Sequence, residues 1–298
     1  MTGFLEYPID LRTGAVASRR VGAFRRLQPR WLADTVDAIW DLDIPDSDAA
    51  RMLTIKHAPS TSLLLMAQYR SPVQVRHRNR DLSTKCAIQI QAHAATLRPT
   101  GALGVIIVCL RPDAAGQIVD APLGEFADAD VHLKSLFSAG DVSTCDDMLA
   151  SARSSIERMA TVEAFLLRRL RPKSDDLACH VAQSLRRNPA LQVESLASKL
   201  GFSARHLARS FNAAFGMGPK YFSRLARFEK MLTARRNGLS WAQVACACGL
   251  SDQAHLVREF KAIVGERPTE FFARELVFGT GGLRQANFVV QRRMFTAS

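Results

Sequence analysis

The chain contains the pattern His-Leu-x-Arg-x-Phe twice, as HLARSF at residues 206–211 and as HLVREF at residues 255–260. Around each copy apolar residues recur every three or four positions, which predicts a helix with one buried stripe. The two stripes are Leu207, Phe211 and Phe215, and Leu256, Phe260 and Val264. A shorter apolar pattern precedes each helix and ends at Gly201 or Gly249, where glycine tolerates the left-handed conformation that ends a helix. The sequence therefore predicts two helix-turn-helix units.

The two copies also agree outside this pattern. Glycine, proline and phenylalanine recur at 216, 219 and 222 and again at 265, 268 and 271. The sequence distance between corresponding residues of the two copies is one residue longer after the turn than before it. The second copy therefore has one extra residue in its turn or helix start. Ser203 can cap the second helix of the first unit, and Ser240 with Gln243 forms a capping-box pattern in the second unit. The alternative interpretation is a structural helical repeat whose outward arginines are only solvated.

Charge favours DNA binding over that alternative. The net charge is +12, but residues 1–150 hold 16 Lys and Arg against 17 Asp and Glu, whereas residues 151–298 hold 24 against 11. A strongly basic second half predicts a polyanionic partner for that half.

The spacer between the two units predicts a second geometric feature. From Pro219 to Arg236 the apolar residues follow one continuous helical pattern. At about 1.5 Å per residue this helix spans roughly 27 Å, close to the roughly 34 Å rise of one DNA turn. Two recognition helices at its ends could then enter successive major grooves. The basic edge Lys220, Arg224 and Arg227 would contact phosphates or water.

Residues 175–276 resemble the DNA-binding domain of the AraC/XylS family of transcription regulators. The resemblance is carried by LASKLGFSARHLARSF, FGMGPKYFSRLARFEKML and VACACGLSDQAHLVREFKAIVGERPTEFF, and it covers about a third of the chain. It implies a sequence-specific regulator, an activator or a repressor, that binds double-stranded operator DNA at a promoter, with RNA polymerase as a further partner. It also implies an effector-sensing or dimerising N-terminal domain, with a small-molecule effector and a homodimer as expectations. We expect the chain to be cytoplasmic, because the sequence shows neither a secretory signal nor an apolar run of membrane length.

The resemblance also implies which residues contact DNA. The expected base-reading residues are Arg205, Ala208, Arg209, Gln253, Ala254, Val257 and Arg258. The expected phosphate-contacting or helix-start residues are Ser203, His206, Asn212, Lys220, Arg224, Arg227, Ser251, His255 and Lys261. Arg and Gln side chains read guanine and adenine by paired hydrogen bonds, whereas Ala and Val can only touch a thymine methyl group. His206 and His255 precede buried leucines, so partial burial is the alternative to a phosphate contact.

The first half is predicted to be rich in strands. VDAIWDLDI at 36–44 alternates apolar with mostly acidic positions, as a half-buried strand does, and CAIQIQAHA at 86–94 alternates in the same way. Several such segments predict an antiparallel sandwich or small barrel, and the resemblance implies a cupin-like barrel. We therefore expect an α+β chain: a β-rich domain at 1–148, a connector helix and linker at 149–174, the DNA-binding domain at 175–276 and a tail at 277–298. The connector helix could also form a dimer interface.

A ligand pocket in the first half would involve Gln89, Gln91 and His93, which the alternation places on one face of a strand. The alternative is that this face is exposed to solvent.

Other function classes find little support. The six cysteines are scattered and are most simply small buried residues, no metal-ligand spacing or cofactor motif is visible, and no segment is apolar enough to span a membrane. We therefore predict no metal, no cofactor and no enzymatic activity. Two alternatives remain: a DNA-repair enzyme using the Cys179-His180 pair, and a non-specific architectural DNA binder.

Overall fold

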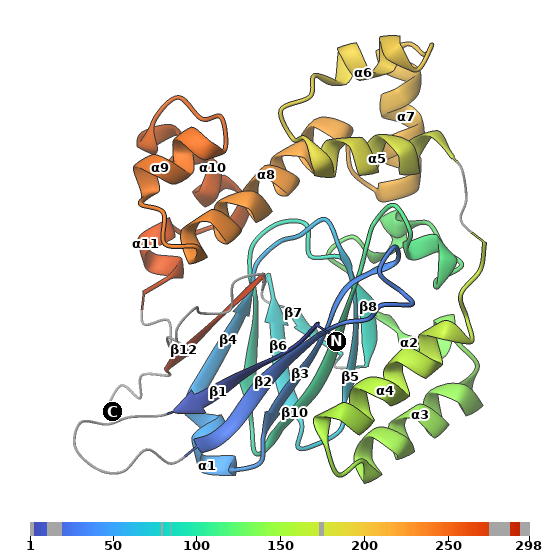
Figure 1. Cartoon of the computed structure of the whole chain (residues 1–298), viewed down its shortest axis with the longest axis vertical. Helices are drawn as coiled ribbons and strands as arrows, with labels where there is room; N and C mark the ends of the chain where they lie inside the picture. Colours follow the sequence, from blue (N-terminus) through green and yellow to red (C-terminus); the bar gives the residue numbers. More distant parts are fainter. Residues whose placement is uncertain are drawn as a thin grey trace.

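The computed structural model describes residues 3–10, 20–78, 80–83, 85–172, 176–273 and 287–292. Its strand-rich part consists of two antiparallel sheets that face each other (Figure 1). In order across the first sheet lie β1 (Gly3–Asp10), β2 (Arg20–Gln28), β3 (Val36–Ile44), β10 (Leu103–Leu110), β5 (Leu63–Gln68), β8 (Cys86–Ile88) and β11 (Val131–His132). In order across the second lie β12 (Phe288–Arg292), β4 (Leu53–His57), β9 (Ala95–Pro99), β6 (Val73–His77) and β7 (Arg80–Leu82). The predicted α+β class with a β-rich N-terminal domain is confirmed.

An apolar core fills the space between the two sheets. Trp40 on β3, Ile55 on β4 and Leu97 on β9 are almost fully buried in it. Phe288 on β12 packs edge-on against Trp40, with ring centroids 4.9 Å apart. The core of the N-terminal domain therefore includes a residue that follows the DNA-binding domain in the sequence.

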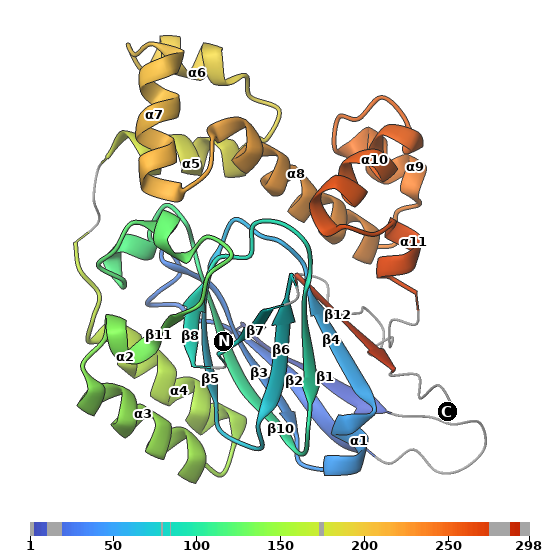
Figure 2. The same ribbon diagram turned by 180° about the vertical axis from the view of Figure 1, so that it is seen from behind.

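The strand β12 comes from the predicted C-terminal tail and pairs antiparallel with β4 along the edge of the second sheet. Figure 2 shows it beside β4, below the helical part. The sequence predicts no structure for the tail, and most of its residues lie outside the described ones. Its residues 287–292 belong to the N-terminal sheet.

The helical elements include short single turns and longer helices. They are α1 (Ser47–Arg51), the 3-10 helices η1 (Ala115–Gln117) and η2 (Leu123–Phe126), α2 (Leu133–Leu136), α3 (Ala139–Ser151), α4 (Ser155–Leu167), α5 (Leu177–Arg187), α6 (Val193–Lys199), α7 (Ala204–Phe215), α8 (Pro219–Arg236), α9 (Trp241–Ala247), α10 (Gln253–Val264) and α11 (Pro268–Phe271). The expected boundary between 148 and 149 falls inside α3, so helices begin earlier than the apolar spacing indicated. Asp176 caps α5 by accepting a hydrogen bond from the backbone N–H of Cys179.

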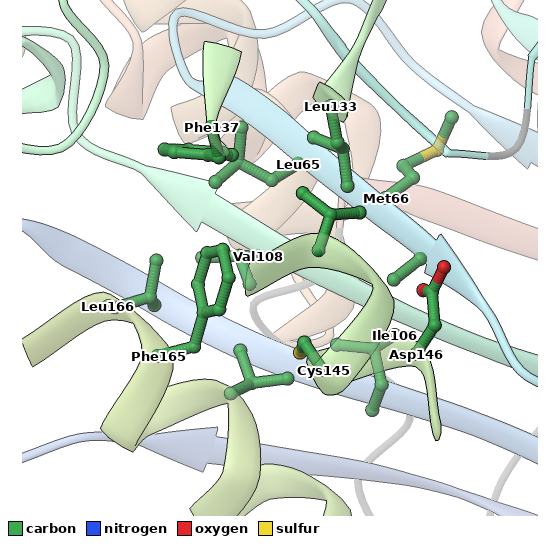
Figure 3. Close-up of a pocket in the computed structure, with 13 residues that line it drawn as sticks. Leu65, Met66, Ile106, Val108, Leu133, Phe137, Cys145, Asp146, Phe165 and Leu166 are labelled. Atoms are coloured by element: carbon green, nitrogen blue, oxygen red, sulfur yellow. The ribbon is translucent and has the colours of Figure 1, made fainter. Parts of the chain in front are cut away.

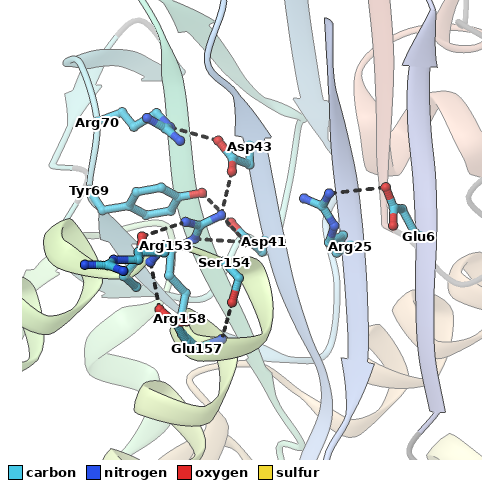
Figure 4. Close-up of polar contacts among 11 residues, drawn as sticks. Glu6, Arg25, Asp41, Asp43, Tyr69, Arg70, Arg153, Ser154, Glu157 and Arg158 are labelled. Atoms are coloured by element: carbon cyan, nitrogen blue, oxygen red, sulfur yellow. Dashed lines mark hydrogen bonds and ion pairs between the residues drawn. The ribbon is translucent and has the colours of Figure 1, made fainter. Parts of the chain in front are cut away.

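The strand β3 has the predicted bounds, but the solvent-facing side predicted for it is wrong. Asp41 is fully buried and Asp43 nearly so, because α4 covers that side of the sheet. Arg158 on α4 forms ion pairs with both carboxylates, and the Tyr69 hydroxyl donates a hydrogen bond to Asp41 at 2.5 Å (Figure 4). Burial raises the pKa of Asp41, and the Arg158 guanidinium opposes that rise. Helix α4 is therefore attached to the barrel by a buried ionic cluster.

The segment CAIQIQAHA is only partly a strand. Pairing stops after Ile88, Gln89 forms an isolated bridge with Ala127, and His93 adopts a left-handed conformation with φ 63°. The predicted single face therefore holds for Gln89 and Gln91, since Gln91 Nε2 donates to Gln89 Oε1 at 3.2 Å, but not for His93, which lies beyond the strand.

Three further observations concern the described residues. None of their helices is long and apolar enough to cross a membrane. No three His, Cys, Asp or Glu side chains among them lie close enough together to hold a metal ion. The prediction that the cysteines are buried holds for Cys86 and Cys248 but not for Cys246, which is exposed.

Candidate nucleic-acid interface

Both predicted helix-turn-helix units are present, at the two ends of α8 (Figure 1). The first consists of α6 and α7 and the second of α9 and α10. Ser203 and Asp252 cap the second helix of each unit by accepting backbone hydrogen bonds. Gly216 and Gly265 end these helices in the left-handed conformation. The turn between α9 and α10 is longer by one residue than the turn between α6 and α7, so the extra residue of the second copy lies in its turn.

The long helix α8 has the bounds predicted from the sequence. Pro219 is its first residue and Asn237 follows its end. The capping box of Ser240 and Gln243 at the start of α9 is also observed. Sequence signals within a few residues of each helix end were therefore enough to predict the bounds of α8 and the start of α9.

The buried stripes of α7 and α10 leave one outward face on each helix. Leu207, Phe211, Leu256 and Phe260 are fully buried. The side chains that face outward and are exposed are Arg205, Arg209 and Asn212 on α7, and Gln253, Ala254, Arg258 and Lys261 on α10. Ala208 and Val257 are half-buried on the same faces. The structure thus brings the predicted base-reading residues together on two outward helix faces.

Among the residues that the structure describes, none of the cations on these faces forms a close ion pair with a carboxylate. Hydrogen bonds from the His255 N–H and the Ser251 hydroxyl lower the pKa of Asp252, and the Arg258 charge lies near enough to lower it further. Arg205, Arg209, Arg258 and Lys261 form no ion pair within that part of the chain. By contrast, Arg186 on α5, which faces the N-terminal domain, lies 2.6 Å from Asp37. Cations that are neither paired nor buried can bind phosphates or base edges without first breaking an internal contact.

The predicted phosphate-contacting residues fall into two groups. Ser203 and Ser251 are exposed at the starts of α7 and α10, while His206 stacks on Phe202 and His255 lies 3.2 Å from the Ser251 hydroxyl. Both histidines are half-buried, and partial burial was the expected alternative to a phosphate contact.

The basic edge of α8 is the second group, and it is paired. Lys220 Nζ lies 2.8 Å from Glu194 Oε1 on the exposed surface. Arg224 and Arg227 lie 3.6 and 3.5 Å from Glu259 Oε1, which is buried on α10. These two arginines therefore link α8 to the second unit. Glu259 was missed from the sequence, although its place four residues after His255 on a helix is a recognisable pairing signal.

The three predicted ligand residues lie where the helical part meets the N-terminal domain. Gln89 Nε2 donates to Thr61 O at 2.8 Å, and Gln91 Nε2 donates to Phe215 O at 3.3 Å. His93 lies against Gly265 and accepts from Arg78 Nε at 3.4 Å. Each is thus held by protein partners, and their role as ligand residues stays a prediction.

Two cavities in the N-terminal domain differ in size and polarity. The first is an apolar cavity of about 40 Å³ between α3, α4 and the first sheet, lined by Leu65, Phe137 and Phe165 among others (Figure 3). It is far smaller than the roughly 150 Å³ needed for a ligand the size of benzene. The second has about 250 Å³ and is lined by the barrel, by α5 and α8, and by β12. Of these two cavities, the second has room for a small ligand. Two more open hollows, of about 510 and 550 Å³, also lie between the N-terminal domain and the helical part.

The Cys179-His180 pair shows no catalytic arrangement. The Cys179 thiol lies 3.6 Å from the carboxylate of Asp176, the residue that caps the same helix. Neighbouring residues of a helix point in different directions, so adjacency in sequence does not bring the two side chains together.

Comparisons with known proteins agree with this geometry. Residues 196–274, which span α6 to α11, match a family model described as "Helix-turn-helix domain". Among curated proteins no sequence matches the chain. Solved structures that resemble it include ToxT from Vibrio cholerae, with 10% identity, a TM-score of 0.45, and coverage of 78% of this chain and 96% of that one.

Two further solved structures are similar. The C-terminal domain of AraT, a response regulator from Geobacillus stearothermophilus, is 21% identical with a TM-score of 0.30, over 32% of this chain and 83% of that one. CuxR, described as an AraC-like transcriptional activator, is 12% identical with a TM-score of 0.28, over 71% of this chain and 82% of that one.

Proposed function

We propose that the chain is a DNA-binding transcription regulator of the AraC type whose helices α7 and α10 read two successive major grooves. The match of residues 196–274 to a helix-turn-helix family model supports this proposal. The observation that supports this most is the pair of outward helix faces, whose cations are exposed and form no close ion pair within the described chain. The base-specific hydrogen bonds would come from Arg205 and Arg209 on α7 and from Gln253 and Arg258 on α10. Because the two faces differ, the DNA site should be asymmetric within one subunit.

The test is substitution of one base-reading residue. Arg258→Ala should reduce discrimination at one base position by about 1 to 3 kcal/mol and leave the other positions unchanged. The matched control is Arg168→Ala, which removes the same charge from an exposed arginine at the end of α4. Binding is measured on every single-base variant of a site that the wild-type protein selects from random DNA. Equal weakening on all sequences would assign Arg258 to the phosphates instead.

We further propose that the cavity of about 250 Å³ is the effector site. Its walls include Arg26, Asp37 and His57 from the barrel, Arg186 and Glu229 from α5 and α8, and Phe288 from β12. This lining is polar and carries both signs of charge, which suits a small polar molecule.

Thermal-shift measurements on the full chain with a panel of sugars, amino acids and carboxylic acids test this proposal. A stabilising compound should lose its effect in Thr233→Phe, which narrows the cavity from α8, and keep it in Thr161→Phe on α4. A compound that stabilises the wild type and Thr233→Phe equally would place the effector elsewhere.

We also propose that a second copy of the chain packs against α3 and α4. Among the described residues, Met148 on α3 and Ile156 and Leu167 on α4 are large apolar side chains left exposed. Sedimentation of Ile156→Lys should show dissociation, whereas Trp31→Lys, at an exposed apolar residue elsewhere, should sediment as the wild type. A monomeric wild type would remove the dimer from the proposal without affecting DNA reading.

The enzyme and architectural alternatives give different outcomes in the same experiments. An architectural binder would select no sequence from random DNA at fixed salt. A repair enzyme would depend on Cys179, so Cys179→Ser would abolish its activity. A regulator of the proposed kind selects a sequence and is unaffected by Cys179→Ser.

A further inference from the structure

Three residues with strained backbone gather in one place. Among the described residues other than glycine, φ is positive at Arg78 (46°), His93 (63°) and Asp128 (51°). The Asp128 carboxylate accepts from the backbone N–H of Gln91 at 2.7 Å and pairs with Arg78 Nη1 at 3.1 Å. Arg78 in turn donates to His93. Such conformations persist only where the surroundings enforce them, and here they hold the loop of residues 91–94 in place.

Residues 91–94 contact both helix-turn-helix units. Gln91 Nε2 donates to Phe215 O, and the Tyr221 hydroxyl donates to Gln91 O at 2.8 Å. The backbone N–H of His93 donates to Ile263 O at 2.8 Å, and that of Ala94 donates to Val264 O at 3.3 Å.

The helix carbonyls that accept these hydrogen bonds, Phe215 O, Ile263 O and Val264 O, belong to the last turns of α7 and α10. Carbonyl groups in the last turn of a helix have no hydrogen-bond partner within that helix. One loop of the N-terminal domain thus binds the C-terminal ends of both recognition helices.

The glycines that end the two recognition helices allow this close approach. A Cβ atom on Gly216 would lie 2.5 Å from Gly124 Cα, and one on Gly265 would lie 2.7 Å from His93 Cδ2. Both are distances that real Cβ atoms do not adopt without displacement of the neighbour. The duplicated glycines therefore end the helices and also let the N-terminal domain contact both units.

We propose that the loop of residues 91–94, held by Asp128, is a positioning element that fixes the separation of the two recognition helices. It thereby determines the spacing between the two half-sites that the protein accepts. An inhibitory contact would cover the reading faces, but Arg205, Arg209 and Arg258 stay exposed while the loop is docked. The loop holds the opposite, C-terminal ends of the helices. This inference rests on the proposed function, because it requires that both units read DNA.

The test compares the spacing preference of the wild type with that of loop variants. Gln91→Ala combined with Tyr221→Phe removes the hydrogen bonds that join the loop to Phe215 O at the end of α7 and to the Tyr221 hydroxyl at the start of α8. Asp128→Ala independently releases the loop. The matched control is Ser223→Ala, which removes a hydroxyl of α8 that donates to Pro189 O, away from the loop. Each protein selects its site from random DNA, and affinities are then measured on that site with one base pair inserted or deleted between the half-sites. Thermal denaturation checks that each variant is folded.

We expect the half-site sequences to stay unchanged while the spacing preference relaxes. For the wild type and Ser223→Ala, one inserted base pair should weaken binding about tenfold, because it shifts one half-site by about 3.4 Å along the DNA and rotates it. For both loop variants the loss should fall below about threefold.

Two other results have separate meanings. If the folded loop variants keep the tenfold loss, α8 alone sets the spacing and the inference is wrong. If the wild type selects no sequence, or only one half-site, the proposed function itself fails.

Discussion

Acidification should destabilise the protein through His57, a histidine at the end of β4 that is buried between β12 and α8. Its exposed fraction is 4%, its Nδ1 lies 2.8 Å from Ala58 O, and its ring lies next to that of Phe288. Burial, reinforced by the Arg236 guanidinium, lowers the pKa of His57 to about 4. The neutral ring is therefore the form that fits the folded protein.

The direction and size of the effect follow from this pKa. An unfolded histidine has a pKa of about 6.5, so between pH 6.5 and pH 4 the unfolded chain binds a proton that the folded chain does not. Stability contributed by His57 is thus present above pH 6.5 and is lost as the pH falls towards 4. Between pH 7 and pH 5 the loss in the free energy of unfolding is about 2 kcal/mol.

Urea denaturation at pH 7 and pH 5 measures this loss, with tryptophan fluorescence, to which the buried Trp40 contributes, as the signal. His57→Leu should be less stable at pH 7 but should lack the additional loss at pH 5. Asp41 and Glu229, whose pKa values burial raises, oppose the acid loss equally in both proteins, so the difference between the proteins isolates His57. His180→Leu, at an exposed histidine of α5, is the control. Equal losses in wild type and His57→Leu would refute a buried neutral ring.

Three further predictions concern stability and binding. Phe288→Ala should lower the free energy of unfolding of the N-terminal domain by about 3 to 5 kcal/mol in urea denaturation, because a fully packed ring leaves a cavity; no loss would mean that β12 does not pack in solution. Arg158→Met should cost about 3 to 5 kcal/mol by leaving Asp41 buried and unpaired, and adding Asp41→Asn should recover part of that stability in the same assay. Affinity for the selected DNA site should fall about a thousandfold or more between 50 and 200 mM salt if six or more phosphates are contacted, whereas a shallow salt dependence in binding titrations would contradict the phosphate contacts.

The sequence predicted the helical part far better than the barrel, and the reason is the range of the interactions. Helix α8 is delimited by Pro219 and by the Asn237-Gly238 pair, and its apolar spacing is contained within its own residues. The caps Ser203 and Ser240 likewise act within a few residues. Elements defined by such local signals need no knowledge of the rest of the fold.

The barrel failures all involve distant partners. The acidic face of β3 has the alternation of a solvent-facing side, and its burial depends on distant partners, above all Arg158, which follows Asp41 by 117 residues, with Tyr69 and Arg70. The strand β12 follows the DNA-binding domain, yet it pairs with β4, which precedes that whole domain in the chain. The contacts of Gln91 and His93 with the two units depend in the same way on the docking of one domain on another. Periodicity cannot reveal which segment covers a face, since that depends on tertiary packing.

The docked arrangement also predicts the sign of coupling between effector and DNA. The cavity of about 250 Å³ has walls from the barrel, α8 and β12, so undocking the helical part would take one wall away. A ligand in it therefore binds the docked state preferentially and shifts the population towards it. In that state the loop of residues 91–94 holds both recognition helices with their reading faces exposed, so ligand and DNA should each strengthen the binding of the other.

Coupling of this kind is reciprocal. The factor by which a compound found by thermal shift raises the affinity of the protein for DNA should equal the factor by which the selected DNA raises the affinity of the protein for that compound. Calorimetric titrations with and without DNA measure both factors, and a ligand that weakens DNA binding would show that docking opposes recognition.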